Sequence, residues 1–250
     1  MNNIKAIFIK QLTTHLKVPS LLGMGILFLI LGAAMIIFLS PPERPDCDVC
    51  IPAYVCDPCE VWEADRFQLP VPSGLGMFSA LIVGLMLMIT TQSLVSEDKT
   101  TTNLRFMAMA DVKPYQYMLA TTAATIIIVA ALVVVYALVD RYFVGTSVLR
   151  YIALCVSGGL VSILLGITIG LSKVPVLALP SFLILGFGPT LSAQNEILAN
   201  VLRFTFTQQV TVGLADLEAD LSQKLLIIAA NGAVVLLLFF IIHRKNKFEL

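Results

Sequence analysis

Long uncharged apolar runs are the feature that most constrains what this chain can fold into. A helix that crosses roughly 30 Å of hydrocarbon needs about 20 apolar residues, because its backbone amides must be satisfied within the helix itself. Four such runs contain no Asp, Glu, Lys or Arg: Ser20 to Ser40, Leu75 to Val95, Tyr115 to Val139, and Leu225 to Ile242. Only 13% of all residues are charged, whereas soluble domains have about 25%. A soluble globular domain is therefore excluded.

A fifth apolar stretch, Tyr151 to Asn195, has Lys173 as its only charge. At about 1.5 Å per residue, this stretch is far too long for one crossing. We therefore expect a turn at Lys173 between two spans, Tyr151 to Ser172 and Val174 to about Leu191. The sequence thus predicts an all-α integral membrane protein, in which residues 1–250 form a single transmembrane permease domain with six transmembrane helices.

The lysines and arginines in the connections predict the orientation, because these residues are retained on the cytoplasmic side. With the N-terminus inside, ten of the sixteen Lys and Arg residues fall in cytoplasmic segments and six in outer segments. We therefore expect a multi-pass protein of the plasma membrane with both termini in the cytoplasm.

Two segments outside the predicted spans have apolar residues at helical spacing. In residues 1–18, Ile4, Ile7 and Phe8 begin such a pattern, with lysines between the apolar positions. This pattern predicts an amphipathic interfacial helix on the inner leaflet. Residues 192–223 are neither apolar enough to cross nor polar enough to be a plain loop. We expect short helices that dip into the outer leaflet, forming a broken re-entrant segment before the last span.

The outer loop of residues 41–73 contains two C-x-x-C pairs, formed by Cys47, Cys50, Cys56 and Cys59. On the outer face, an even number of cysteines favours two disulfides that hold a small loop together. Zinc binding by the four thiolates is an alternative, although the five residues between the pairs are short for a zinc ribbon. Reactive thiols are a third possibility.

Several small and polar residues within the spans are interpreted as helix-packing sites rather than as substrate ligands. They are Thr90, Thr91, Gln92, Gly158, Gly159, Gly166, Gly170 and Asn231. Cys155, also within a span, is expected to be a buried small apolar residue.

The sequence contains no motif for nucleotide binding or for hydrolytic catalysis. It has no G-x-x-x-x-G-K-[ST] loop, no G-x-S-x-G elbow and no H-E-x-x-H pair. The four clear spans carry no charged residue, which disfavours a proton-coupled transporter. We therefore expect no catalytic residue, no metal site outside the cysteine loop, and no cofactor in this chain.

The connection between the second and third spans, residues 96–114, resembles the first cytoplasmic loop of type-2 ATP-binding-cassette (ABC) permeases. That loop typically has an acid, a Gly-Thr pair, a Leu-rich turn and a Pro-Val-like stop. The matching residues are Glu97 for the acid, Thr102 for the threonine, Phe106 and Met107 for the turn, and Asp111, Val112 and Lys113 for the stop. Thr101 occupies the usual glycine position, and Asp111 the usual proline position.

The resemblance implies the membrane subunit of an ABC exporter, which moves an unidentified substrate outward. Its first cytoplasmic loop would form a coupling helix that docks on a separate ATP-binding cassette subunit, and that partner would bind ATP and Mg. A second permease half, identical or different, would complete the assembly in the lipid bilayer, and no nucleic acid is expected. The residues that would contact the ATPase subunit are Glu97, Lys99, Thr102, Arg105, Phe106, Met107 and Asp111.

Other interpretations of the sequence stay open. Residues 96–114 also have the composition of an ordinary solvated connector between spans. The chain could instead be a membrane-embedded redox or metal-handling protein that uses the outer cysteines. A non-transporting immunity or sensor subunit is a third function class.

Overall fold

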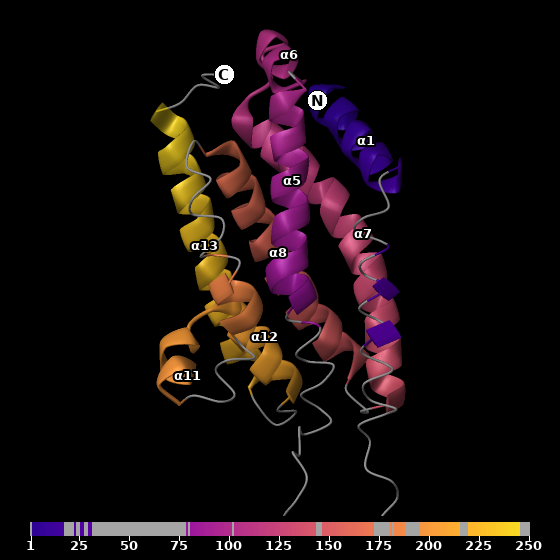
Figure 1. The fold of residues 1–250 in the computed structure, drawn as a ribbon, viewed down its shortest axis with the longest axis vertical. Helices are drawn as coiled ribbons and strands as arrows, with labels where there is room; N and C mark the ends of the chain where they lie inside the picture. The colour runs from indigo at the N-terminus through magenta and orange to yellow at the C-terminus, as the bar shows by residue number, and fades with distance from the viewer. Residues whose placement is uncertain are drawn as a thin grey trace, which may run out of the picture.

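The structure is a computed structural model in which every regular element of the described residues is helical (Figure 1). The described residues are 2–17, 23, 26–27, 30–31, 79, 81–101, 103–143, 147–172, 181, 183–188, 196–215 and 220–245. The elements are α1 (Asn2–Lys17), η2 (Ile82–Met86), α5 (Leu87–Thr100), α6 (Asn103–Met109), α7 (Pro114–Phe143), α8 (Val148–Leu171), η4 (Leu183–Phe187), α11 (Glu196–Leu202), α12 (Phe206–Ala215) and α13 (Leu221–Lys245). Of these, η2 and η4 are π-helices. The all-α prediction is confirmed for this part of the chain.

Within the part of the chain that the structure describes, three helices are long and apolar enough to cross a membrane. The crossing stretches are Pro114–Val139 in α7, Val148–Leu171 in α8 and Leu221–Ile242 in α13. They coincide with the predicted third, fourth and sixth spans, whose length and apolar composition are thereby confirmed. The second predicted span is described from Leu81 onward, where η2 leads directly into α5. Most of the first and fifth predicted spans lies outside the described residues, so the count of six remains a prediction.

Helix α8 lies at the centre of the described fold, packed against α5, α7, α12 and α13. Glycines bring the backbones of α8 and α5 close together, as small residues do between membrane helices. A Cβ atom added at Gly166 would lie 2.7 Å from the carbonyl oxygen of Met88, and one added at Gly170 would lie 2.9 Å from the Cβ of Val95. The interpretation of these glycines as close-packing sites is confirmed.

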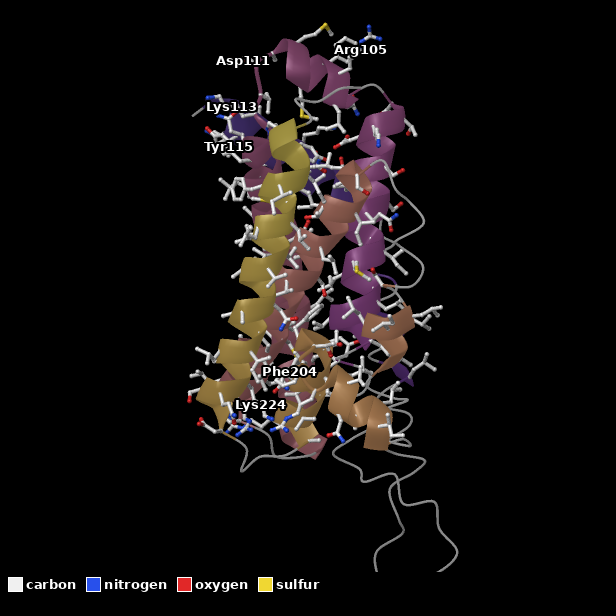
Figure 2. All side chains as sticks on the ribbon, turned by 90° about the vertical axis from the view of Figure 1, so that its left-hand side faces the viewer. Arg105, Asp111, Lys113, Tyr115, Phe204 and Lys224 are labelled. Atoms are coloured by element: carbon white, nitrogen blue, oxygen red, sulfur yellow. The ribbon has the colours of Figure 1, made fainter. Side chains whose placement is uncertain are left out.

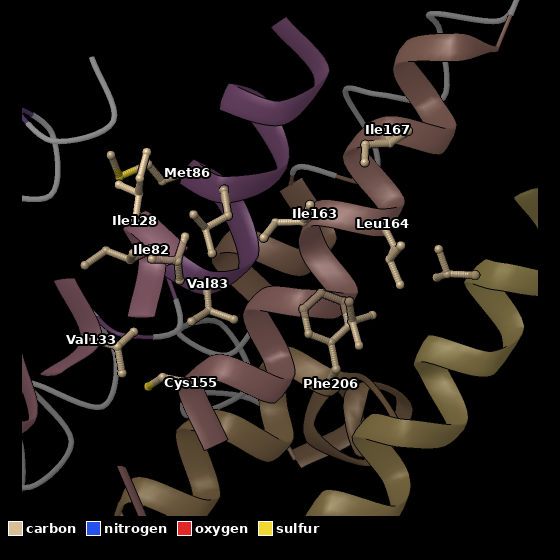
Figure 3. Close-up of a cluster of buried hydrophobic side chains, with 14 of the residues drawn as sticks. Ile82, Val83, Met86, Ile128, Val133, Cys155, Ile163, Leu164, Ile167 and Phe206 are labelled. Carbon is tan, nitrogen blue, oxygen red and sulfur yellow. The ribbon is translucent and has the colours of Figure 1, made fainter. Parts of the chain in front are cut away.

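The buried apolar side chains of η2, α7, α8 and α12 form one continuous core (Figure 3). Labelled members in the figure include Ile82, Val83, Ile128, Ile163 and Phe206. Cys155 belongs to the same cluster, which confirms the prediction that it is a buried small residue. The long helices therefore pack around α8 as one body.

The connecting segments between the long helices lie at two opposite ends of the molecule. Arg105 and Asp111 lie at one end, and Phe204 and Lys224 lie at the other (Figure 2). The start of α1 and the last turn of α13 lie at the same end as α6 (Figure 1). This arrangement agrees with the predicted topology, in which α1, the loop of α6 and the C-terminal end of α13 share one side of the membrane.

The prediction of short helices before the last span is confirmed by α11 and α12. Side chains of neighbouring helices donate to backbone carbonyl oxygens of α12 and of the turn between α11 and α12. The Asn231 amide of α13 donates to the carbonyl oxygen of Phe204 at 2.8 Å, and Arg150 Nε of α8 donates to that of Gly213 at 2.9 Å. The re-entrant segment itself, and the depth of these helices in the outer leaflet, remain predictions.

The N-terminal segment forms helix α1, as the apolar periodicity predicts, and α1 packs along α7 (Figure 1). Its apolar residues face the protein, because Ile7 is buried and Ile4, Phe8 and Leu12 pack against the main core. These apolar residues therefore pack against the protein, and the position of α1 on the inner leaflet remains a prediction.

Candidate functional site

The turn between α5 and α6 is closed by the run of threonines that follows Glu97. The carbonyl oxygen of Glu97 accepts hydrogen bonds from the backbone N–H of Thr101 at 2.9 Å, from Thr101 Oγ1 at 2.7 Å and from Thr100 Oγ1 at 3.0 Å. Threonine hydroxyls offer the backbone such local partners and so favour helix ends. Helix α5 therefore stops at this position and the chain reverses into α6.

Asp111 ends α6 in a left-handed backbone conformation, with a φ of 54°. The N–H of Val112 donates to the carbonyl oxygen of Met107 at 3.0 Å, which is the closing bond of a Schellman motif. Asp111 thus occupies a position where glycine is the common residue. Proline, which is usual at this position in the ABC permease loops that the sequence resembles, could not adopt this conformation, because its ring locks φ near −65°.

The start of α7 is fixed by its own sequence. Pro114 is the first helical residue, where its missing N–H costs nothing. Gln116 Oε1 accepts a hydrogen bond from the backbone N–H of Lys113 at 3.0 Å, which resembles half of a capping box. The short helix α6 is therefore held between two well-defined helix ends.

Asp98, in the last turn of α5, is the centre of the polar contacts at this end of the molecule. Its side chain is 7% exposed. Oδ1 accepts from Lys10 Nζ and from Asn103 Nδ2, the latter at 3.2 Å. Oδ2 accepts from Gln11 Nε2 at 2.7 Å and from Tyr117 Oη at 2.9 Å. We call these five residues the Asp98 junction.

The Asp98 junction joins four helices through one carboxylate. Lys10 and Gln11 come from α1, Asn103 from α6 and Tyr117 from α7. A buried carboxylate is costly unless it is paired and hydrogen-bonded, and four donors fill about all of its acceptor positions. Helix α1 therefore supplies two of these four donors, one of which is the ammonium group of Lys10.

A second polar contact joins α1 to α7 one helical turn further along. His15 Nε2 lies 3.0 Å from Thr125 Oγ1, and both residues are buried. Burial lowers the pKa of His15 below its usual value of 6.5, because desolvation disfavours the imidazolium form. The neutral imidazole is therefore the form that fits this contact.

Most of the predicted ATPase-contact residues lie on the surface of this loop. Glu97, Lys99, Arg105, Phe106 and Asp111 are exposed. Lys99 also reaches α8, since its Nζ lies 3.4 Å from the carbonyl oxygen of Ser172. Thr102 falls outside the described residues, as do Cys47, Cys50, Cys56 and Cys59.

Helix α6 exposes two large apolar side chains, Phe106, which is a predicted ATPase contact, and Met109, which is not. Phe106 is 63% exposed and Met109 is 67% exposed. Met107 is half-buried and packs against the chain's own core, beside the buried Leu104. The exposed pair is therefore Phe106 and Met109, three residues apart and so on one side of the helix.

Two features of this site were missed at the level of sequence, namely the Asp98 junction and the exposure of Met109. The sequence of α1 does contain a signal for the Asp98 junction, because Gln11 and His15 follow the buried Ile7 at intervals of four residues. Polar residues within an apolar stripe require buried polar partners. The identity of those partners depends on which helix packs against α1.

An apolar pocket lies between η2, α7 and α8, away from the Asp98 junction. Ile82, Met86, Val133 and Cys155 are among its lining residues. Such a lining suits an apolar ligand, and its residues with a hydroxyl group are Ser79, Tyr136 and Tyr151. Among the residues that the structure describes, no group of three or more His, Cys, Asp or Glu residues could hold a metal ion.

No protein-family model matches this sequence, and the sequence is not significantly similar to any curated protein. Sequence similarity therefore assigns no family. The function has to be inferred from the apolar helices and from the loop that carries α6.

Proposed function

We propose that this chain is the membrane subunit of an ATP-driven ABC exporter, and that α6 is the coupling helix that docks on a separate ATPase subunit. The observation that carries the proposal is the exposed apolar pair of α6 at one tip of the molecule. Phe106 and Met109 lie on a helix whose two ends are fixed, beyond the ends of the long apolar helices.

The surface of α6 has the make-up of a docking site. Large aromatic and methionine side chains are enriched in the cores of protein interfaces, and charged residues in their rims. Phe106 and Met109 would form the core of this contact, with Arg105 and Glu97 on its rim. Exposed ion pairs contribute only about 0 to 1 kcal/mol, so we expect the apolar pair to supply affinity and the charges to orient docking.

The connections of α6 would carry movement of the partner into the membrane helices. The chain runs from α5 through α6 into α7 within a few residues at each turn. Helix α5 packs against α8 across Gly166 and Gly170, so its displacement would be passed to α8. A rigid loop on closely packed helices suits a subunit that responds to closure of an ATPase dimer.

The energy for transport would come from the partner subunit. No nucleotide-binding motif is present in the sequence, so ATP and Mg would bind the partner subunit. We propose an assembly of two permease halves and two ATPases in the plasma membrane, with α1, α6 and the C-terminal end of α13 on the cytoplasmic side. The substrate would move outward between the two halves.

Copurification of the tagged chain with an ATPase subunit tests the proposal. The Phe106→Asp and Met109→Asp double variant should lose the ATPase while still inserting into the membrane. Met107 is left unchanged, because its half-buried side chain supports the fold.

Phe204→Asp is the matched control, because Phe204 is 67% exposed at the opposite end. This control variant should keep the partner. If the double variant still copurifies with an ATPase as well as the unmodified chain does, α6 is not the docking helix.

A further inference from the structure

We propose that α1 regulates α6 through the Asp98 junction: α1 docked on Asp98 holds α6 in its partner-binding orientation, and release of α1 weakens the ATPase contact. Lys10 and Asp98 are thus positioning residues that act on a surface they do not touch. The coupling of α1 to α6 concerns this chain alone, whereas its effect on the ATPase rests on the proposed function.

The carboxylate of Asp98 is shared between α1 and the first residue of α6. Asp98 Oδ1 accepts from both Lys10 Nζ and Asn103 Nδ2. The same Asn103 amide donates to Thr101 Oγ1 at 2.8 Å, within the turn that connects α5 to α6. The orientation of the Asp98 carboxylate therefore sets the start of α6.

Helix α1 is the element that can leave this arrangement. Lys10 and Asp98 are 88 residues apart in the sequence, and the described contacts of α1 with the loop are made by side chains alone. Among the described large apolar side chains of α1, Ile7 is buried, Ile9 is exposed, and Ile4, Phe8 and Leu12 are partly buried. The buried face also holds Gln11 and His15. Elements with few buried apolar contacts open at low free-energy cost.

Departure of α1 would leave Asp98 without its counter-charge. Tyr117 and Asn103 would remain as donors, and a buried carboxylate with an incomplete shell is strongly disfavoured. Opening the turn around Thr101 would return the carboxylate to water and would disorder the start of α6. By linkage, a partner that holds α6 in place must favour docking of α1 by the same factor.

Hydrogen exchange of the purified full chain in lipid nanodiscs, without any partner, tests the coupling. The Asp98→Asn variant keeps the shape of the side chain but removes its charge. We expect amide exchange in both α1 and α6 to rise by about tenfold or more, as loss of charged hydrogen bonds would produce. The matched variant Glu97→Gln, at the exposed neighbouring position, should leave exchange in α1 and α6 unchanged. Faster exchange in α1 with unchanged α6 would overturn the proposal.

A second pair of variants keeps the test independent of how Asp98→Asn folds. Lys10→Met removes the cation from a side chain that is 37% exposed, and Lys5→Met removes an exposed lysine of the same helix. Lys10→Met should speed exchange in α1 and α6 together, and Lys5→Met in neither. Equal exchange in the two variants would contradict the role of Lys10.

Copurification with an ATPase subunit distinguishes failure of this proposal from failure of the proposed function. If an ATPase copurifies with the unmodified chain, Lys10→Met should retain several-fold less of it than Lys5→Met does. Equal retention would overturn control by α1 while leaving the docking role of α6 intact. If no ATPase copurifies with the unmodified chain, the proposed function fails, and the exchange experiment still decides whether α1 and α6 are coupled.

Discussion

The two ends of the molecule both carry short helices between long ones, but they are held by different chemistry. At the α6 end, a single buried carboxylate joins α1, α5, α6 and α7. At the opposite end, Arg150 and Asn231 fasten α12 and the turn after α11 by donating to backbone carbonyl oxygens. The contacts at the α6 end include an ion pair between Lys10 and Asp98, whereas the acceptors at the opposite end are neutral backbone carbonyl groups. The proposed switch therefore lies at the α6 end.

The largest expected difference between the two ends is in the free energy of unfolding that is lost when one side chain is removed at each end. Asp98→Ala would leave Lys10 without its counter-charge and Gln11 and Tyr117 without their acceptor. We expect a loss of about 2 to 4 kcal/mol in the free energy of unfolding, moderated because Lys10 reaches water. Asn231→Ala breaks a bond at the surface and should cost at most about 1 kcal/mol.

Reversible unfolding in mixed detergent micelles would measure both variants, with Glu97→Gln as the control for a lost surface carboxylate. Equal costs for Asp98→Ala and Asn231→Ala would remove the distinction between the two ends.

A smaller effect is expected of pH on the docking of α1 against α7, and this effect should be confined to the α6 end. The folded pKa of His15 lies below its unfolded value of about 6.5, so the unfolded or undocked state binds the proton more readily. The contribution of His15 to docking is therefore complete above that unfolded pKa and decreases as pH falls below it.

Accessibility of a cysteine introduced at Thr14 should increase between pH 7.5 and pH 5.5. In a His15→Gln background, the increase should disappear. An increase of the same size in that background would assign the effect to other groups.

The smallest effect concerns the turn after α6. Asp111→Gly should stabilise the chain by about 0.5 to 1 kcal/mol, because glycine adopts a φ of 54° without a steric penalty. Asp111→Pro should instead break the turn, since proline cannot adopt positive φ. Melting temperatures of the two variants would therefore shift in opposite directions, and a stabilising proline would show that Asp111 is not left-handed.

The sequence was sufficient to predict the parts of the fold that depend on local composition. Uncharged runs predicted the spans that α7, α8 and α13 provide, and helical spacing predicted α1. The glycines of α8 were interpreted correctly, because small residues in a membrane helix have few other uses. The resemblance to ABC permeases singled out the loop that forms α6.

The Asp98 junction could not be predicted, because it depends on contacts between residues that are far apart in the chain. Glu97 and Asp98 are adjacent acids, and only the packing of α1 on α7 decides that Asp98 is the buried one. The exposure of Met109, rather than Met107, likewise depends on how the turns at its two ends orient α6. The π-helical geometry of η2 and η4 has no local sequence signal that we recognise.

Photocrosslinking from α6 is the most direct test of the central claim. A benzoylphenylalanine placed at position 106 in the cell membrane should crosslink to a protein that contains nucleotide-binding motifs and hydrolyses ATP. The same probe at position 204, equally exposed at the other end, should not crosslink to it. Absence of an ATPase crosslink at position 106, or an equal yield at position 204, would contradict the account.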